Sequence, residues 1–344
     1  MNILDRIDEV TTISADAFKY LSLSDKLDLY ITNVVQPIAL KKENELELKD
    51  VCVYSPPSSY GWGRVFFGWL GMLTDCIEQQ IEKPSVALLD WNPSVPYLWY
   101  NQTLYPWEYN IWKERFPILQ HAPTQSHPVD AWQYWMEYTP KLCASFCQRV
   151  IQPSPLLQKY ISMTYGSFFC SPEGDKVNVT GIHIRSQGCT DTYIQQFINM
   201  IYICIYKNNE HVVIVSDDYE RIHAIIEKEG LPNSQWCIIP SSPSHTFLSD
   251  DIDAVIHAYG DWWILSRCNK LILTGGHAVI ENKDIGKNKK GFMSMFGLSA
   301  AVWSGIEPFL LLNNGQMINR WPSYYHADKT EHLLHYYTTK EWIR

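Results

Sequence analysis

The sequence lacks the marks of a secreted or membrane protein. Residues 1–6 (MNILDR) carry charges, and no apolar segment of the signal-peptide type follows them. The longest strongly apolar stretch, residues 198–206, is too short to cross about 30 Å of hydrocarbon. The nine cysteines form no C-x-x-C pair, and an odd number cannot all pair within the chain. We therefore predict a cytoplasmic protein with reduced thiols and no transmembrane segment.

Basic residues are also scarce. The 28 Lys and Arg against 37 Asp and Glu give a net charge of −9, which argues against a nucleic-acid partner. A small anion is not excluded, because a few well-placed arginines suffice to bind one. The chain has no P-loop, G-x-G-x-x-G, H-E-x-x-H or G-x-S-x-G motif, which argues against the enzyme classes that these motifs mark.

What the sequence does have is a repeated alternation of short apolar strands and helices. A length of 344 residues predicts two domains, and an apolar content of 46% is enough for a large core. The first layer has a strand at 51–54, a helix at 65–81 and a strand at 85–90. This alternation predicts an α/β fold with a doubly wound parallel sheet. In the second half the predicted strands are 177–185, 211–216, 236–239, 270–274 and 308–312, with helices at 193–206, 219–229, 250–267 and 294–303.

Aromatic residues are abundant, with 14 Trp, 21 Tyr and 12 Phe, and they crowd into residues 91–140. Prolines in the same segment favour loops there, before a predicted helix at about 131–150. Trp and Tyr present flat apolar faces that suit stacking on sugar rings. Core packing is the ordinary alternative for each of them.

In a doubly wound sheet, ligands bind at the carboxyl ends of the strands, near the point where the strand order reverses. His183 and Arg185 lie at such an end, and the alternation of side chains along a strand puts both on one face. Arginine suits a phosphate because its fork donates two hydrogen bonds and keeps its charge. The alternative is that Arg185 pairs with a core carboxylate and His183 is an interior histidine.

Asp217 and Asp218 follow the next apolar strand. Their carboxylates suit a metal or the hydroxyls of a ribose, but Asp218 also precedes a predicted helix and suits its N-cap. Of these interpretations, the capping role is favoured by the residues alone. The segment contains no D-x-D triplet of the kind that marks a metal-dependent transferase.

Glycine-containing segments offer main-chain N–H groups to a phosphate. Thr274, Gly275 and Gly276 end one strand, and Ser294 opens the following helix. Between them, residues 283–290 form the most basic stretch of the chain, which suits a pyrophosphate or, as the favoured alternative, a solvated loop. A second segment, 61–64 (GWGR), heads the first helix and would bring Gly63 and Arg64 to a cleft between the domains.

Three segments together resemble the fucosyltransferase superfamily. Residues 181–185 (GIHIR) resemble its G-x-H-x-R-R motif, and 213–218 (VIVSDD) resemble its hydrophobic-strand-T-D-D motif. Residues 261–272 (DWWILSRCNKLI) are similar to its D-x-x-x-L-S-x-C/A-D-x-L-I signature. The GWGR segment stands where many members have a Gly-x-Gly-Asn loop. The resemblance covers about residues 175–305, and the N-terminal half only in outline.

The resemblance implies a GT-B fold, with two Rossmann-like domains facing each other across a cleft. An acceptor-side domain at 1–165, with the aromatic-rich insertion, would precede a nucleotide-sugar domain at 166–320, and 321–344 would pack back on the first domain. The implied reaction is inverting transfer of fucose from GDP-fucose to a glycan hydroxyl. It implies no metal and no cofactor beyond the donor substrate, because arginine and helix dipoles offset the charge of the leaving group.

The same resemblance assigns roles to residues. Arg185 would be catalytic and hold the β-phosphate, and His183 with Asp217 or Asp218 would contact the nucleoside. The other donor-binding residues would be Thr274, Gly276, Ser294, Gly63 and Arg64.

The chain departs from the family at several positions. Ser186 stands in place of a frequent second arginine, Arg64 in place of asparagine, and Gly275-Gly276 with the basic insertion in place of a Ser-rich turn. These departures bear on the identity of the sugar. Two alternatives therefore stay open: the same fold with another nucleotide sugar, and a catalytically inactive carbohydrate-binding protein. The base is unassigned among the candidates Glu108, Asp90 and Asp191.

Overall fold

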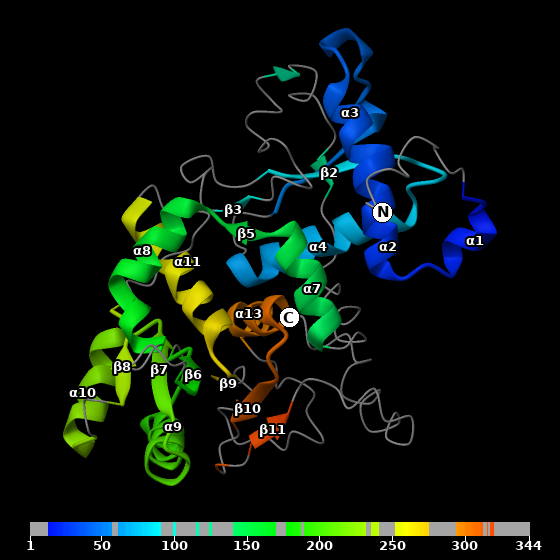
Figure 1. The fold of residues 1–344 in the computed structure, drawn as a ribbon. Coiled ribbons are helices and arrows are strands. Elements are labelled where there is room, and N and C mark those ends of the chain that lie inside the picture. Colours follow the sequence, from blue (N-terminus) through cyan, green and yellow to red (C-terminus); the bar gives the residue numbers. More distant parts are fainter. Residues whose placement is uncertain are drawn as a thin grey trace.

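The computed structural model describes most of the two predicted α/β regions (Figure 1). Most of the aromatic-rich segment, Gly276, the basic stretch 283–290 and the segment 321–344 lie outside the described residues. The described residues are 13–56, 61–90, 99–100, 115–116, 124–125, 140–169, 177–186, 189–231, 235–240, 252–274, 294–311, 315 and 317–319.

The first sheet is parallel and has the order β2-β1-β4. Its strands are β1 (Val51–Tyr54), β2 (Val86–Leu89) and β4 (Thr124–Gln125), and α4 (Trp62–Glu78) connects the first two. The predicted strand–helix–strand order is confirmed. The helix lies three residues earlier than predicted at both ends. It ends at Glu78 although apolar residues continue to Ile81, because the Gln80 amide donates to the carbonyl oxygens of Ile77 and Lys26.

Short helices at the N-terminal end pack against this sheet. The hydroxyl of Tyr30, which is fully buried, donates to the Ser85 carbonyl oxygen at 2.9 Å and accepts from the Ala87 N–H at 3.0 Å. These bonds tie the N-terminal helices to β2. The segment consists of α1 (Ala15–Lys19), α2 (Leu23–Tyr30), the π-helical turn η2 (Ile31–Val35), α3 (Gln36–Leu40), and the 3-10 turns η3 (Glu43–Glu45) and η4 (Leu48–Asp50).

The second sheet has the order β11-β10-β9-β6-β7-β8, and all its strands are parallel except β11. Its parallel strands are mostly buried, which explains their continuous apolar runs. The predicted doubly wound sheet is therefore confirmed in this half. The strands are β6 (Val179–Ile184), β7 (His211–Ser216), β8 (Trp236–Ile238), β9 (Lys270–Thr274), β10 (Pro308–Leu311) and β11 (Met317–Asn319).

In the described part of the chain, the helices that connect these strands are α9 (Asp191–Tyr202), α10 (Tyr219–Glu229), α11 (Ile252–Arg267) and α13 (Met295–Ser304). The predicted helix 193–206 starts two residues earlier because Thr190 caps α9, and it continues into a π-helical turn, η7 (Ile203–Lys207). From β6 the chain adds β7 and β8 on one side, then returns to add β9 and β10 on the other. The strand order thus reverses between β6 and β9, where a ligand is expected.

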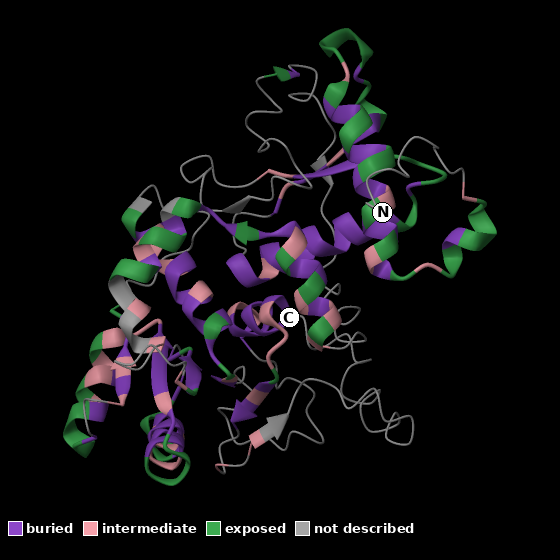
Figure 2. Ribbon diagram, in the orientation of Figure 1, coloured by how far each residue is buried: buried purple, intermediate pink, exposed green. Residues whose placement is uncertain are grey.

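The helices of the two sheets pack on one another. Figure 1 shows α4, α7 (Pro140–Val150), α11 and α13 gathered between the two sheets, and Figure 2 shows α4 and α13 largely buried. The indole N–H of Trp303 in α13 donates to the Ile151 carbonyl oxygen after α7, at 2.8 Å. The described residues therefore share one hydrophobic core, and the domain boundary near residue 165 stays a prediction.

After α7 the chain forms a short strand, a helix and a 3-10 turn before it enters the second sheet. β3 (Trp99–Tyr100) pairs with β5 (Gln152–Pro153), and α8 (Pro155–Tyr165) leads into the 3-10 turn η6 (Gly166–Phe169). The Tyr160 hydroxyl and His257 Nδ1 are 2.8 Å apart, which joins α8 to α11. Among the described residues, no helix has the length and apolar character that a membrane crossing requires.

The first turns of α4 and α13 touch main chain to main chain. A Cβ atom on Gly63 would lie 2.3 Å from the carbonyl carbon and oxygen of Met295. The ring of Trp62 packs edge-on against Trp262, with centroids 6.0 Å apart, and so joins α4 to α11. Because each of α4 and α13 starts at the carboxyl end of its own sheet, these two edges face each other.

This contact predicts that Gly63→Ala destabilises the protein by about 1–3 kcal/mol, because the fixed main chain of α13 must move to admit a methyl group. Glycine to alanine inside a helix ordinarily stabilises by about 0.5–1 kcal/mol, so the sign itself is diagnostic. Urea denaturation measures the free energy of unfolding. The matched control is Gly166→Ala, where a Cβ meets nothing within 4 Å. Equal stabilities of the two variants would contradict the contact.

Candidate functional site

Thr274 joins the two strand ends at which the strand order reverses. Its hydroxyl oxygen accepts the main-chain N–H of Arg185 at 3.0 Å, and its carbonyl oxygen accepts the Ser294 N–H at 3.3 Å. Thr274 itself is fully buried. The end of β6, the end of β9 and the start of α13 are therefore held at one place, as the sequence predicts for these three residues.

His183 lies beneath this junction with an unsatisfied ring nitrogen. Its side chain faces α13, where the Phe296 ring centroid is 5.3 Å away. Gly297 makes room for it, because a Cβ there would lie 3.3 Å from His183 Nδ1. His183 is only 7% exposed, and its Nδ1 has no hydrogen-bond partner among the described residues. A buried polar atom of this kind calls for a ligand or an equivalent partner.

The charge state of His183 follows from its surroundings. Burial lowers its pKa to about 4, with the Asp217 carboxylate acting in the opposite direction and the Arg185 guanidinium adding to the decrease. The imidazole is therefore neutral at neutral pH, able to donate from one nitrogen and to accept at the other.

Ser294 provides a second buried polar atom at the same place. It precedes α13 in the N-cap position, but its side chain makes no capping hydrogen bond. Its hydroxyl oxygen is buried without a hydrogen-bond partner among the described residues. An N-cap serine ordinarily accepts an N–H of the first helical turn. Here the hydroxyl and the positive end of the helix dipole remain available to an anion.

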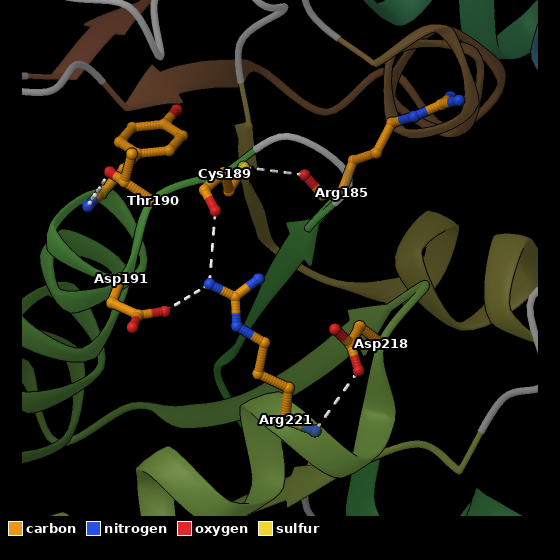
Figure 3. A network of polar contacts seen from close by, with 7 residues as sticks. Arg185, Cys189, Thr190, Asp191, Asp218 and Arg221 are labelled. Atoms are coloured by element: carbon orange, nitrogen blue, oxygen red, sulfur yellow. Dashed lines mark hydrogen bonds and ion pairs between the residues drawn. The ribbon is translucent and has the colours of Figure 1, made fainter.

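Arg185 supplies the positive charge. It is exposed, which disfavours the interpretation as a core ion pair. Its main-chain groups are bonded to Thr274 and to the Cys189 thiol, which donates to the Arg185 carbonyl oxygen at 3.0 Å. Figure 3 shows its side chain pointing away from the neighbouring polar network of Asp191 and Arg221. The backbone is thus fixed while the guanidinium reaches outward.

The two aspartates after β7 make local bonds. Asp217 Oδ1 accepts the Ser186 N–H at 2.5 Å, so this carboxylate holds the turn that follows β6. Asp218 accepts the Arg221 N–H at 3.4 Å and caps α10, which is the alternative that the sequence favours. Their contact with a nucleoside stays a prediction.

The remaining predicted residues are placed less directly. Gly63 contacts the first turn of α13, and Arg64 follows it in α4, half-buried. Among the base candidates, Asp191 pairs with Arg221, whereas the Asp90 carboxylate lies 3.5 Å from the Ser55 hydroxyl at the end of β2. Glu108 and Gly276 lie outside the described residues.

Sequence reasoning missed Cys189 and Arg221, which hold the turn after Arg185. They are separated by a strand and a helix, and no motif links them. It also missed Gly297, although a glycine in the first turn of a predicted helix is a signal of close packing. Within the described part of the chain, no three His, Cys, Asp or Glu side chains are grouped as a metal site requires.

Comparison with known proteins finds similarity at the level of structure. No protein-family model and no curated protein sequence matches the chain. An arginine-to-lysine mutant of Arabidopsis thaliana FUT1 in complex with GDP is 12% identical, with a TM-score of 0.46 over 83% of this chain and 78% of that one. NodZ α-1,6-fucosyltransferase crystallised with GDP is 12% identical, with a TM-score of 0.44 over 78% of this chain and 98% of that one.

A second NodZ structure, soaked with GDP-fucose, is also 12% identical, with a TM-score of 0.41 over 78% of this chain and 99% of that one. NodZ is by name a fucosyltransferase.

The low pKa of His183 predicts a specific loss of stability in acid. In the unfolded chain a histidine titrates near 6.5, whereas in the folded protein the pKa is about 4, so acid favours the unfolded state. The stability due to neutral His183 is complete above about pH 6.5 and decreases as pH falls toward about 4, by about 2 kcal/mol at about pH 5.

The measurement is urea denaturation of the protein and of His183→Gln at about pH 7.5 and pH 5. The unmodified protein should lose about 2 kcal/mol more than the variant between these pH values. An equal loss in both would show that His183 titrates normally.

Proposed function

We propose that the protein is a glycosyltransferase that moves fucose from GDP-fucose to a hydroxyl of a glycan acceptor, with inversion and without a metal ion. The observation that carries the proposal is that one positive charge and two buried polar atoms without hydrogen-bond partners among the described residues converge at one strand-order reversal. The Arg185 charge, the buried His183 Nδ1 and the buried Ser294 hydroxyl all lie where α13 begins. An arginine fork, a hydroxyl and a helix N-terminus are together suited to a diphosphate.

The same groups account for catalysis. Donor cleavage breaks the bond between the anomeric carbon and the β-phosphate oxygen, and negative charge grows on that oxygen. The backbone of Arg185 and the first turn of α13 are fixed in place before the reaction, so the Arg185 charge and the helix dipole would stabilise this charge more in the transition state than in the bound donor. Arg185 is therefore the catalytic residue of the proposal.

The acceptor completes the reaction from the opposite side of the sugar. Its hydroxyl oxygen forms the new bond to the anomeric carbon as the bond to phosphate breaks, its proton is released, and GDP leaves. Because the carboxyl edges of the two sheets face each other at Gly63 and Met295, an acceptor held by the first sheet would face the donor. This supports an acceptor-side domain at 1–165 and a donor domain at 166–320 as part of the proposal.

The choice of GDP-fucose rests on the resemblance of residues 181–185, 213–218 and 261–272 to fucosyltransferase motifs. A second candidate, another nucleotide sugar, is favoured by Ser186, which leaves one arginine where the family often has two. The N–H of Ser186 is bonded to Asp217 and its side chain is buried. A third hypothesis is a carbohydrate-binding protein without catalytic activity. A cytoplasmic location stays a prediction from the sequence.

We expect Arg185→Gln to weaken GDP binding at least about tenfold and to abolish sugar transfer, because the charge that faces the diphosphate is lost. The free energy of unfolding should change by less than about 0.5 kcal/mol, because Arg185 is exposed and its bonds to Thr274 and Cys189 use main-chain atoms. Calorimetric titration with GDP and urea denaturation measure the two quantities. A variant that unfolds would support a structural role for Arg185 instead.

Ser294→Ala should separate binding from stability. Removing a buried hydroxyl that has no described partner should leave the protein as stable or up to about 1 kcal/mol more stable, while GDP binds about tenfold more weakly. The matched control in the same helix is Ser299→Ala. Ser299 Oγ accepts the Trp262 indole N–H at 2.8 Å, so its removal should destabilise by about 1–3 kcal/mol and leave GDP binding unchanged. If Ser294→Ala destabilised the protein and left GDP binding unchanged, Ser294 would contribute only to the packing of α13.

A thermal-shift and calorimetric screen of GDP-, UDP- and dTDP-sugars tests the donor itself. Stabilisation by GDP-fucose, with slow release of GDP and fucose in the absence of acceptor, is the expected result. A response to a UDP- or dTDP-sugar alone would favour the second candidate. Binding of glycans without a response to any nucleotide would favour the inactive carbohydrate-binding protein.

A further inference from the structure

The turn that follows β6 is held by hydrogen bonds to Thr274, Asp217 and Cys189. The Arg185 N–H donates to the hydroxyl oxygen of Thr274 in β9 at 3.0 Å. The Ser186 N–H donates to the carboxylate of Asp217 after β7 at 2.5 Å. The Cys189 thiol donates to the Arg185 carbonyl oxygen at 3.0 Å, and the Cys189 N–H donates to the Ser186 carbonyl oxygen at 2.8 Å. Every main-chain polar group of this segment is thus accounted for.

Cys189 is in turn held by Arg221. The Arg221 guanidinium donates to the Cys189 carbonyl oxygen at 3.3 Å and forms an ion pair with the Asp191 carboxylate. Arg221 is itself fixed, because its main-chain N–H donates to the capping carboxylate of Asp218. Figure 3 shows the guanidinium of Arg221 lying between Asp191 and Cys189, with Arg185 beyond Cys189.

These contacts contribute little to stability. The Asp191 side chain is 83% exposed, and ion pairs of this kind contribute about 0–1 kcal/mol. Their effect on geometry is larger, because Cys189 binds Arg221 through its carbonyl oxygen and Arg185 through its thiol. A change at Arg221 is therefore transmitted through Cys189 to the backbone of Arg185.

We infer that Arg221 is a positioning residue for Arg185, acting through Cys189. The inference rests on the proposed function, in which the Arg185 guanidinium holds the diphosphate of the donor. Arg221 sets the direction in which that guanidinium leaves the turn, and it contacts neither phosphate nor sugar. Small displacements of a catalytic group cost large factors in rate, so the effect should appear in activity more than in stability.

The test compares Arg221→Met with Arg149→Met. Arg149 is a matched control, since it too is 34% exposed and pairs with an exposed aspartate, Asp28 of α2. Both variants should lower the melting temperature by the same small amount. Only Arg221→Met should weaken GDP binding, by about tenfold, and lower kcat with GDP-fucose by a larger factor.

Two further variants separate positioning from direct binding. Arg221→Lys keeps the charge but loses the planar fork, so it should recover only part of the GDP affinity. In an Arg185→Lys background, Arg221→Met should cause no further loss, because the group that it positions is already replaced. A loss of the same size in that background, with full recovery by lysine, would mean that Arg221 binds the phosphate directly and would overturn the inference.

Hydrogen exchange measures the local stability of the turn after β6 in the absence of ligand. Peptides that cover residues 185–191 should exchange faster in Arg221→Met than in Arg149→Met. If the unmodified protein binds no nucleotide but this difference is present, the proposed function fails and Arg221 orders a turn of another site. If the protein binds GDP and Arg221→Met binds it equally well, the proposed function stands and the positioning role is wrong.

Discussion

The fold depends on how one threonine satisfies the ends of two adjacent strands. Thr274 is fully buried, and its hydroxyl and carbonyl bind the backbone after β6 and the backbone before α13. Parallel strands end with main-chain groups that the sheet no longer pairs, and these must find partners if they are buried. Thr274 meets that requirement where the strand order reverses. It thereby also fixes the spacing between Arg185 and the first turn of α13.

Several polar side chains elsewhere in the core are paired, although the buried indole nitrogen of Trp236 also has no hydrogen-bond partner among the described residues. Tyr30 both donates and accepts between two segments, Thr180 donates to Glu210 at 2.6 Å, and Ser299 bridges Trp262 and Phe296. In contrast, His183 Nδ1 and Ser294 Oγ are buried without hydrogen-bond partners among the described residues. A desolvated and unpaired polar atom lowers stability, by about 1–3 kcal/mol each. Two of them at one strand-order reversal are what a ligand site formed at the expense of stability should show.

Whether an element or a site residue could be predicted depends on whether a short segment of the sequence carries its pattern. The sequence predicts the observed bounds of three elements, because apolar runs end at polar or glycine residues there. They are the strands 211–216 and 270–274 and the helix 219–229. The rule for strand ends then selects Arg185, Asp217, Asp218, Thr274, Gly275 and Gly276 for inspection. The contact of Gly63 with Met295 and the bonds of Arg221 to Cys189 could not be predicted. Both depend on how elements far apart in the sequence are packed, and neither leaves a periodic pattern.

The charge of the site follows from the same packing. A bound diphosphate would favour the imidazolium form of His183, but raising its pKa from about 4 to about 7 would require about 4 kcal/mol of coupling. In the protein without ligand the ring is therefore neutral at neutral pH. His183 therefore supplies hydrogen bonds rather than charge, and of the two side chains it is Arg185 that carries the fixed positive charge. In the proposed reaction, which builds up negative charge on a leaving phosphate, the direction of that one guanidinium is then decisive, and the proposal therefore includes the turn that holds its backbone.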